Sequence, residues 1–307
     1  MKKSIRIGTR ESQLAVWQAR EVKNFLSRYG FPSELVYIKS EGDIDVNTPL
    51  YEMGVQGIFT RSLDAALLND RIDIAVHSMK DVPTQLPQEI IQAAVLKRGA
   101  VNDLLVFKTN GDFLNKENDV ANIATSSLRR KAQWLNKYTH HHIHNLRGNV
   151  NTRLRKLSEE NWNAAIFAQA GLERIGLRPE NSLVINWMLP APAQGAIMVV
   201  CRKNDNYTFE ACQNLNDETT ALCVKVERDF LRTLLGGCST PISALAVIKN
   251  NNVHFKGNIL SLDGSKKAEV EKTSAIHEAD NCGKTAAQEL LANGGKEIAE
   301  EIRHAVS

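Results

Sequence analysis

Short apolar runs alternate with helix-forming stretches over the first two-thirds of the chain, and this alternation restricts it to few folds. Runs at 4–8, 35–39 and 72–76 have the character of strands, whereas 12–26 and 60–69 carry apolar residues at helical spacing. The β-branched run at 72–76 is typical of a strand buried on both faces. Strands that alternate with helices predict an α/β layer with a parallel or mixed sheet.

The same alternation recurs further along the chain. Strand-like runs at 120–124, 142–146 and 164–168 each lead into a helical pattern, and 196–201 is one more strand. From residue 216 the pattern changes to one long amphipathic helix, three strand-like runs and two terminal helices. We therefore predict that the chain from residue 216 on forms a separate α+β module.

Charge is distributed unevenly. The chain has a formal net charge of +3, but residues 121–178 hold ten lysines and arginines against three acids, a local charge of +7. A basic middle segment indicates an anionic partner, which could be nucleic acid, phosphate or carboxylates. Aromatic residues are only 6% of the chain, and single-stranded nucleic acid is bound by stacking on aromatic rings. We therefore expect no nucleic-acid partner.

Arginines and hydroxyl residues follow several predicted strands. Ligands of such sheets bind beyond the carboxyl ends of the strands, and the planar guanidinium grips a carboxylate or phosphate with two bonds. Any single arginine of this kind is as readily a surface or ion-pair residue, so the argument for an anion pocket depends on the set. The set is Arg10, Ser12, Thr125, Ser127, Arg129, Arg130, Arg147, Arg153, Arg155 and Arg174.

Asp81 follows a predicted strand and lies beside Lys80 in a region rich in cations. Two interpretations stay open. The residue can be a turn aspartate ahead of Val82 and Pro83, or a carboxylate that exchanges protons or stabilises a cation. His77 is open to the same choice between a structural and a catalytic role.

Cys238 differs from the other cysteines because Gly236-Gly237 and Ser239-Thr240-Pro241 surround it with an open turn. A preceding helix C-terminus raises a thiol pKa, which favours a single covalent attachment over a nucleophile used in every turnover. The five cysteines contain no C-x-x-C pair, which argues against a disulfide framework or zinc site and for the reducing cytoplasm.

Neither a metal nor a membrane is expected as a partner. The cluster His140-His141-His142 with His144 has no acid or thiol nearby, so we expect no metal site. No apolar run approaches the roughly 18 residues of a membrane span. The amino terminus has two lysines but no apolar segment of a signal peptide, which again favours a cytoplasmic protein.

Several motifs stand in one order along nearly the whole chain. They are His77–Pro83 (HSMKDVP), Thr125–Arg130 (TSSLRR), Leu146–Leu154 (LRGNVNTRL) and Gly236–Cys238 (GGC). In this order they resemble the motifs of the porphobilinogen deaminase, or hydroxymethylbilane synthase, family. Further similar stretches are Ile7–Arg10, Gly171–Gly176 and Pro192–Gly195.

The resemblance implies two α/β lobes similar to periplasmic binding proteins and a small α+β C-terminal domain with a three-stranded antiparallel sheet. The domains would be residues 1–97 with 196–215, residues 98–195, and residues 216–307. The cofactor would be dipyrromethane, attached to Cys238 through a thioether. The enzyme would act as a monomer. It would condense four porphobilinogens head to tail, release ammonia at each step and free hydroxymethylbilane by hydrolysis.

The resemblance also implies residue roles. Asp81 would assist deamination, stabilise the azafulvene cation and help to remove the α-proton. Residues that would hold the cofactor are Cys238, Lys80, Asp43, Ser78, Thr125, Ser127, Arg129, Arg130, Arg147 and Gly148. Residues that would bind porphobilinogen are Arg10, Ser12, Arg147, Arg153, Arg174 and Gln194. In the loop after the second strand, Glu52 and Gln56 stand where relatives often carry lysines.

An alternative of another class is a two-lobed solute-binding protein with an anion pocket and no chemistry. That alternative explains neither Cys238 nor the third domain. The intact mass separates the two, because only the enzyme would carry two extra pyrrole units.

Overall fold

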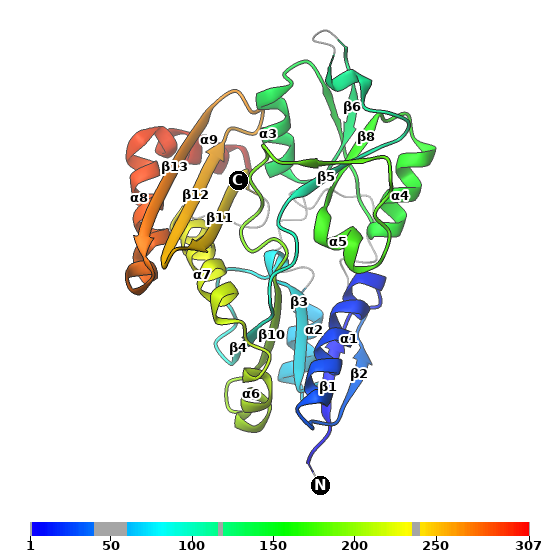
Figure 1. Cartoon of the computed structure of the whole chain (residues 1–307), viewed down its shortest axis with the longest axis vertical. Helices are drawn as coiled ribbons and strands as arrows, with labels where there is room; N and C mark the ends of the chain where they lie inside the picture. The colour runs from blue at the N-terminus through cyan, green and yellow to red at the C-terminus, as the bar shows by residue number, and fades with distance from the viewer. Residues whose placement is uncertain (1, 40–59, 116–118, 235–239, 307) are drawn as a thin grey trace. The chain divides into compact units, whose positions relative to one another are not determined.

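The computed structural model describes residues 2–39, 60–115, 119–234 and 240–306, which form two compact units (Figure 1). Unit 1 consists of the described residues within Met1–Val46, Val55–Gly99 and Gly195–Leu222. Unit 2 consists of those within Ala100–Gln194 and Cys223–Ser307. The finer division into three domains with the bounds given above stays a prediction.

Unit 1 is built on a five-stranded mixed sheet. Its elements are β1 (Ile5–Thr9), α1 (Gln13–Arg28), β2 (Ser33–Tyr37), α2 (Arg61–Leu68), β3 (Ile74–Ser78), the 3-10 turn η2 (Met79–Asp81), β4 (Ile90–Val95), β10 (Ile197–Arg202) and α6 (Asn206–Gln213). The strand order is β2-β1-β3-β10-β4. β1, β2 and β3 run parallel, whereas β10 is antiparallel to both of its neighbours. The carboxyl ends of β1 and β3 therefore share one edge.

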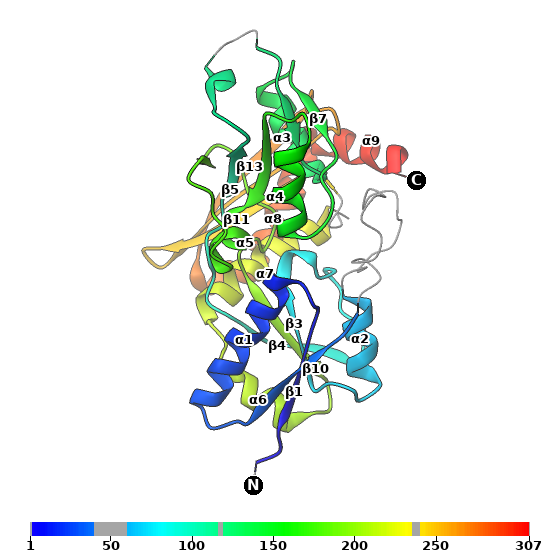
Figure 2. The same cartoon turned by 90° about the vertical axis from the view of Figure 1, so that its right-hand side faces the viewer.

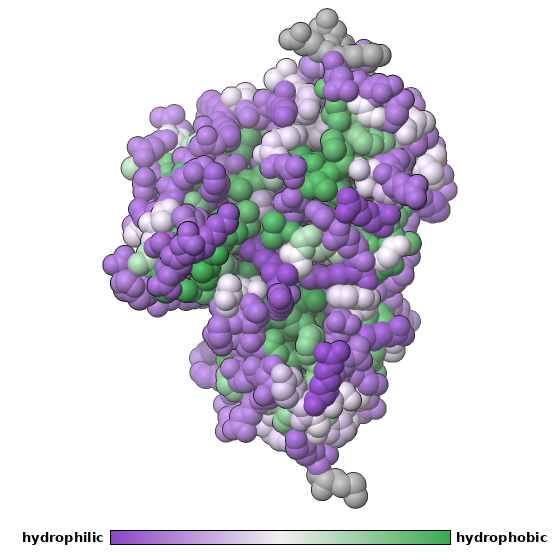
Figure 3. Space-filling view, in the orientation of Figure 1, coloured by the Kyte–Doolittle hydropathy of each residue, from purple (hydrophilic) through white to green (hydrophobic). Residues whose placement is uncertain are grey.

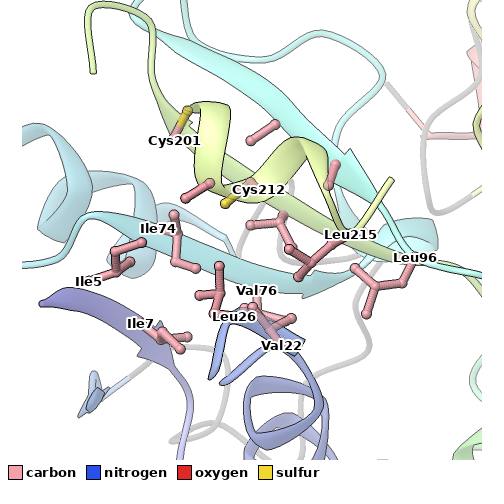
Figure 4. Close-up of a cluster of buried hydrophobic side chains, with 14 of the residues drawn as sticks. Ile5, Ile7, Val22, Leu26, Ile74, Val76, Leu96, Cys201, Cys212 and Leu215 are labelled. Carbon is pink, nitrogen blue, oxygen red and sulfur yellow. The ribbon is translucent and has the colours of Figure 1, made fainter. Parts of the chain in front are cut away.

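Side chains along β1 point alternately to the two faces of the sheet of unit 1. Ile5 and Ile7 point to one face, where they are buried with apolar residues of α1 and α6 (Figure 4). Gly8 points to the other face, and a Cβ there would lie 3.1 Å from Leu63 Cδ2 of α2. α1 and α2 thus cover opposite faces of the sheet, as Figure 2 shows.

Unit 2 contains a second five-stranded mixed sheet. Its elements are β5 (Asp103–Phe107), η3 (Asp112–Leu114), β6 (Asn122–Ala124), α3 (Leu128–Lys137), β7 (His142–His144), α4 (Val150–Glu159), β8 (Ala164–Ala168), α5 (Gln169–Arg174) and β9 (Ser182–Ile185). The order is β7-β6-β8-β5-β9, with β5 antiparallel to its neighbours. Leu104 and Leu105 fall into different buried clusters, one with Leu157 of α4 and one with Trp134 of α3. Both faces of the sheet are therefore covered.

The rest of unit 2 is an antiparallel sheet with helices. Its elements are α7 (Glu218–Thr233, which begins in unit 1), β11 (Ile242–Lys249), β12 (Asn252–Leu260), β13 (Lys267–Ala275), η4 (Ile276–Asn281), α8 (Cys282–Leu290), η5 (Leu291–Gly295) and α9 (Lys296–Val306). The strand order is β11-β12-β13. Phe230 of α7 packs on Phe255 of β12, with ring centroids 5.0 Å apart.

A tight turn between β12 and β13 attaches this sheet to α3. Gly264 has a φ of +77°, and a Cβ there would lie 2.4 Å from the Ala132 carbonyl oxygen. Asn136 Nδ2 donates to the Gly264 carbonyl at 2.8 Å. Only glycine allows this approach of two backbones without strain.

The predicted fold class is confirmed: two α/β sheets and a three-stranded antiparallel sheet with helices. The third predicted strand extends to Ser78, because β10 pairs Met198 with His77 and Ile197 with Ser78. Hydrophilic residues cover most of the face seen in Figure 3, with hydrophobic residues between them. Within the described ranges, no helix has the length and apolar character that a membrane crossing requires.

A buried carboxylate holds β1 to the rest of unit 1. Asp73 accepts hydrogen bonds from the Arg6 backbone N–H at 2.8 Å, from the Arg6 guanidinium at 2.8 and 2.9 Å, and from Arg202 at 3.1 Å. Burial alone would raise the pKa of Asp73, but the hydrogen bonds from Arg6 and Arg202 outweigh it and hold that pKa well below its usual range. The carboxylate is therefore charged at neutral pH.

Replacing Asp73 with alanine should lower the free energy of unfolding of unit 1 by about 3 kcal/mol or more, because two guanidiniums lose a buried partner. Urea unfolding, followed by hydrogen exchange of the β1 amides, measures the change. Because folding lowers the Asp73 pKa, its contribution is present above the unfolded pKa and disappears as the pH falls toward the folded one. The variant should therefore lose less stability than the wild type on acidification.

Asp70 provides the matched control for this prediction. Its carboxylate lies 2.9 Å from Arg6 and 3.3 Å from Arg202, but its side chain is 75% exposed. Asp70→Ala should cost less than about 1 kcal/mol, as exposed ion pairs do. Equal losses in the two variants would show that burial of Asp73 is not what matters.

Candidate active site

The predicted site residues within the described ranges fall into two groups, one in each unit. Unit 1 carries Arg10, Ser12, Ser78, Lys80 and Asp81. Unit 2 carries Thr125, Ser127, Arg129, Arg130, Arg147, Gly148, Arg153, Arg174 and Gln194. Asp43, Glu52, Gln56 and Cys238 lie outside the described residues.

In unit 1, two strand ends bring predicted residues to one edge of the sheet. β1 and β3 pair in parallel, so both end there. Arg10 follows β1, and, besides burial, its positive charge lowers the pKa of His77, which lies near the end of β3. Lys80 and Asp81 belong to the single 3-10 turn that follows β3. The structure therefore places cations and one carboxylate around the same edge.

Asp81 stands on a fixed backbone with its carboxylate available. The Met79 N–H donates to the Ala196 carbonyl at 3.0 Å, and the Val82 N–H donates to the Met79 carbonyl at 3.1 Å. Asp81 is half-buried, and no hydrogen bond or ion pair joins its side chain to another described residue. A positioned carboxylate of this kind can accept N–H groups of a ligand or exchange a proton with it.

Two serines of unit 1 also have structural partners. Ser12 Oγ accepts the Ala15 N–H at 3.4 Å and caps α1. Gln18 Nε2 donates to Ser78 Oγ at 2.9 Å. A hydroxyl that accepts a bond keeps a proton to donate, so capping by Ser12 is compatible with anion binding.

His77 is buried and uncharged at neutral pH. Burial, and then the charge of Arg10, lowers the pKa of His77 to about 4. Its Nε2 has no hydrogen-bond partner among the described atoms. His77 therefore cannot serve as a cationic partner for carboxylates near pH 7.

In unit 2, hydroxyls organise the start of α3. Ser127 Oγ accepts the Arg130 N–H at 3.4 Å and caps the helix, while Thr125 Oγ1 accepts the Ser127 N–H at 3.2 Å. β6 ends immediately before this segment, beside the parallel end of β8. The helix start adds a partial positive charge at that edge.

A glycine turn leads from β7 into α4. Gly148 has a φ of +106°, and a Cβ there would lie 2.6 Å from Thr152 Cγ2. Arg153 Nε donates to the Gly148 carbonyl at 2.7 Å, which ties the arginine to this turn. Arg147 is buried beside it, with 4% of the residue exposed.

Arg155 and Arg174 differ in their surroundings. Arg155 pairs with Glu159 at 2.5 Å on the exposed surface of α4, a structural ion pair. Arg174 lies half-buried in the last turn of α5. Of the two, only Arg174 remains a candidate for ligand binding.

Arg129 and Arg130 share one buried carboxylate, that of Asp103. Asp103 Oδ1 accepts from Arg130 Nε at 3.1 Å and from Arg130 Nη2 at 2.8 Å. Arg129 Nη2 lies 2.8 Å from Asp103 Oδ2. Arg130 Nη1 donates to the Ile166 carbonyl at 2.9 Å, and Arg129 Nη1 donates to the Leu189 carbonyl at 2.8 Å. Burial lowers the pKa of Arg129, while Asp103 opposes that shift.

Gln194 belongs to the same cluster. Its Nε2 donates to Asp103 Oδ1 at 3.0 Å and to the Val101 carbonyl at 2.7 Å, and the residue is fully buried. The amide therefore supports the ion cluster from within unit 2. A contact between Gln194 and substrate stays a prediction.

The histidine cluster has structural partners. His141 accepts from Trp134 Nε1 at 3.2 Å and stacks on Tyr138, and His144 Nε2 lies 2.8 Å from Asn122 Oδ1. Burial lowers the pKa of His141. Over the part of the chain that the structure describes, no group of three or more His, Cys, Asp or Glu side chains could hold a metal ion.

Unit 2 also contains an open cavity of about 430 Å³ between α3, Trp187 and the strands β12 and β13. Lys137, Lys256 and Lys267 line it together with Glu269 and Glu271. Lys256 pairs with Glu271, and Lys267 with Glu269. None of the predicted site residues lines this cavity.

Sequence reasoning missed Asp103 and Gln18. Asp103 begins β5, whose run Asp-Leu-Leu-Val-Phe carries the pattern of a short buried strand. An acid at the head of such an apolar run is the signal that could have revealed it. No comparable signal marks Gln18, which lies in the middle of α1.

Comparisons with known proteins cover nearly the whole chain. A family model described as porphobilinogen deaminase, dipyromethane cofactor binding domain, matches residues 5–210, and one described as porphobilinogen deaminase, C-terminal domain, matches residues 221–292. A porphobilinogen deaminase of Chlorobium phaeobacteroides is 39% identical over 312 residues, covering 99% of both chains. One of Desulforamulus reducens is 38% identical over 307 residues, with the same coverage.

Among solved structures, the methionine binding protein MetQ is similar at a TM-score of 0.44 and 14% sequence identity. The match covers 71% of this chain and 92% of MetQ. A likeness this distant carries no argument about the ligand.

Proposed function

Because the chain belongs to the porphobilinogen deaminase family, we propose that Asp81 and the basic residues of both units carry out that family's reaction. The chain is a hydroxymethylbilane synthase of tetrapyrrole biosynthesis with a dipyrromethane cofactor. The observation that carries this conclusion is 39% identity over 99% of the chain. The alternative of a solute-binding protein without catalysis is wrong, because both parts of the chain match models of this enzyme family.

The residues of unit 2 fit a cofactor that bears carboxylates. Arg129 and Arg147 are buried, and Arg129 Nε has no partner among the described atoms, so an anion would supply what it lacks. When bound, dipyrromethane supplies a covalently held primer with acetate and propionate groups. We propose attachment at Cys238 and binding by Lys80, Asp43, Ser78, Thr125, Ser127, Arg129, Arg130, Arg147 and Gly148.

The substrate porphobilinogen also carries carboxylates that arginines can bind. Each charge-assisted hydrogen bond to a carboxylate contributes about 1.5–3 kcal/mol, so several arginines retain an incoming pyrrole firmly. The residues proposed to bind porphobilinogen are Arg10, Ser12, Arg147, Arg153, Arg174 and Gln194. Because the primer is tethered, each coupling needs only one diffusing reactant, porphobilinogen, and this lowers the entropic part of the barrier.

Asp81 is the proposed catalytic residue. The aminomethyl C–N bond of porphobilinogen breaks, and ammonia leaves with the electron pair. The carboxylate of Asp81 accepts the pyrrole N–H and stabilises the resulting cation. Dipyrromethane would supply the free α-carbon that receives the new C–C bond, and Asp81 would assist removal of the proton that this carbon loses. The side chain is half-buried and has no hydrogen-bond or ion-pair partner among the described residues, which supports this role.

Mass spectrometry and a product assay test the proposal together. The purified chain should weigh two pyrrole units more than the 34.1 kDa of its sequence, and it should convert porphobilinogen to hydroxymethylbilane. An unmodified mass in a preparation without product formation contradicts the proposal.

We further propose a cytoplasmic monomer that acts on porphobilinogen alone. The odd set of cysteines without C-x-x-C supports a reducing compartment. Analytical ultracentrifugation should give a single species near 34.1 kDa. A concentration-independent dimer contradicts the monomer.

A further inference from the structure

We infer that Asp103 is a positioning residue for the carboxylate-binding arginines of unit 2. It fixes Arg130 as an anchor and orients Arg129 toward an external anion. The inference rests on the proposed function, since it concerns how that function's anionic ligands are held. Asp103 was absent from every residue role derived from the sequence.

Arg129 and Arg130 differ in how many of their guanidinium nitrogens have a hydrogen-bond or ion-pair partner. Each of the three guanidinium nitrogens of Arg130 donates a hydrogen bond within the cluster, two to Asp103 Oδ1 and one to the Ile166 carbonyl. Arg129 has partners for its two Nη atoms, but its buried Nε has none among the described atoms. A buried donor without a partner is costly, and a carboxylate oxygen is the strongest acceptor for it.

The net charge of the cluster formed by Asp103, Arg129 and Arg130 also favours binding of an external anion. Two guanidiniums and one carboxylate leave the cluster with a net charge of +1. Within the described ranges, no second carboxylate forms an ion pair with Arg129 or Arg130. All three residues are buried, with at most 5% exposed. A buried excess charge calls for a further anion, and a carboxylate of the bound oligopyrrole provides one.

The topology explains why Asp103 can do this. β5 runs antiparallel to β8 and pairs Asp103 with Ala168, so Asp103 lies at the edge where β8 ends. Gln194 donates to Asp103 and to the Val101 carbonyl. Val101 and Gln194 lie near the two ends of the segment Ala100–Gln194. The cluster therefore joins residues near both ends of that segment to the arginines.

The variant Asp103→Asn tests the inference. Asparagine keeps an acceptor for Arg130 and Gln194, but its Nδ2 donor would face Arg129 Nη2 and release that arginine. Because Arg129 is proposed to hold the cofactor, we expect less than half of the purified variant to carry the two-pyrrole mass, the result of losing one charge-assisted bond. The KM for porphobilinogen and the kcat of the loaded fraction should change much less, because the proposed substrate-binding arginines are untouched.

Asp73→Asn is the matched control, because it also removes the charge of a buried aspartate paired with two arginines, but in unit 1. It should lose stability while its cofactor content and KM stay within about twofold of the wild type. Both variants are assayed at a temperature where circular dichroism shows them folded. Equal losses of cofactor content in the two variants would overturn the inference, as would a normal cofactor content in Asp103→Asn.

If Asp103→Asn does not fold, Asp103→Glu replaces it. Glutamate keeps the charge but moves it by one methylene, so the cofactor content should fall clearly below that of the wild type while the chain stays folded. An unchanged cofactor content in this variant contradicts the inference. A wild-type chain without product formation or cofactor mass would instead contradict the proposed function.

Discussion

A Cys238→Ser variant should be purified without dipyrromethane and without synthase activity. A thioether forms through a sulfur nucleophile, and a serine hydroxyl is far less nucleophilic at neutral pH. Without a tethered primer, the growing chain has no fixed starting point. Activity should therefore fall below detection, and the intact mass should equal that of the sequence.

The other cysteines cannot replace Cys238. Cys201, Cys212, Cys223 and Cys282 are all buried. Burial raises the pKa of Cys201 to about 11 and raises that of Cys212 further, so these thiols stay protonated. Cys282→Ser is the control, and it should keep the mass of two pyrrole units. Retention of that mass in Cys238→Ser would disprove the attachment site.

An Asp81→Asn variant should keep the cofactor and lose turnover. Asparagine has nearly the same size, but it can neither stabilise a cation by charge nor take up a proton. General acid–base groups contribute about 10²–10⁴-fold to rate, and we expect kcat to fall by that factor. Since Asp81 has no described side-chain partner to lose, the free energy of unfolding should change by less than about 1 kcal/mol.

Intact mass, single-turnover kinetics and thermal unfolding measure these three quantities for Asp81→Asn. Asp64→Asn is the matched control, because Asp64 is another half-buried aspartate of unit 1. Asp64 lies in α2 and is none of the proposed site residues, so its replacement should leave kcat unchanged. Burial raises the pKa of Asp64 to about 6. Near-normal turnover in Asp81→Asn would remove Asp81 from the mechanism.

The sequence predicts the elements whose patterns are local. Helices α1 and α3 begin within one residue of the positions that Ser12 and Ser127 indicate, because a capping side chain acts on its own first turn. β4, β5, β9 and α6 were missed. β5 pairs with β8 and β9, which lie far from it along the chain, so its strand depends on tertiary contacts rather than on a local pattern.

The site was predictable only in part. The strand ends place Arg129 and Arg130 just beyond β6, at the edge where the parallel strand β8 also ends, and their role in ligand binding stays a prediction. Their burial and their shared partner were not predictable. Asp103 reaches them only because β5 runs antiparallel to β8, and nothing local in the sequence specifies that direction.

The position of β10 has a consequence for synthesis of the chain. β10 is the sole partner of β4 in the described sheet, and more than a hundred residues separate Val95 from Ile197. At roughly 5–20 residues per second, the ribosome needs on the order of ten seconds to make that interval. During this time the nascent chain holds β4 as an apolar strand with no neighbour, open to aggregation with other chains and to capture by chaperones.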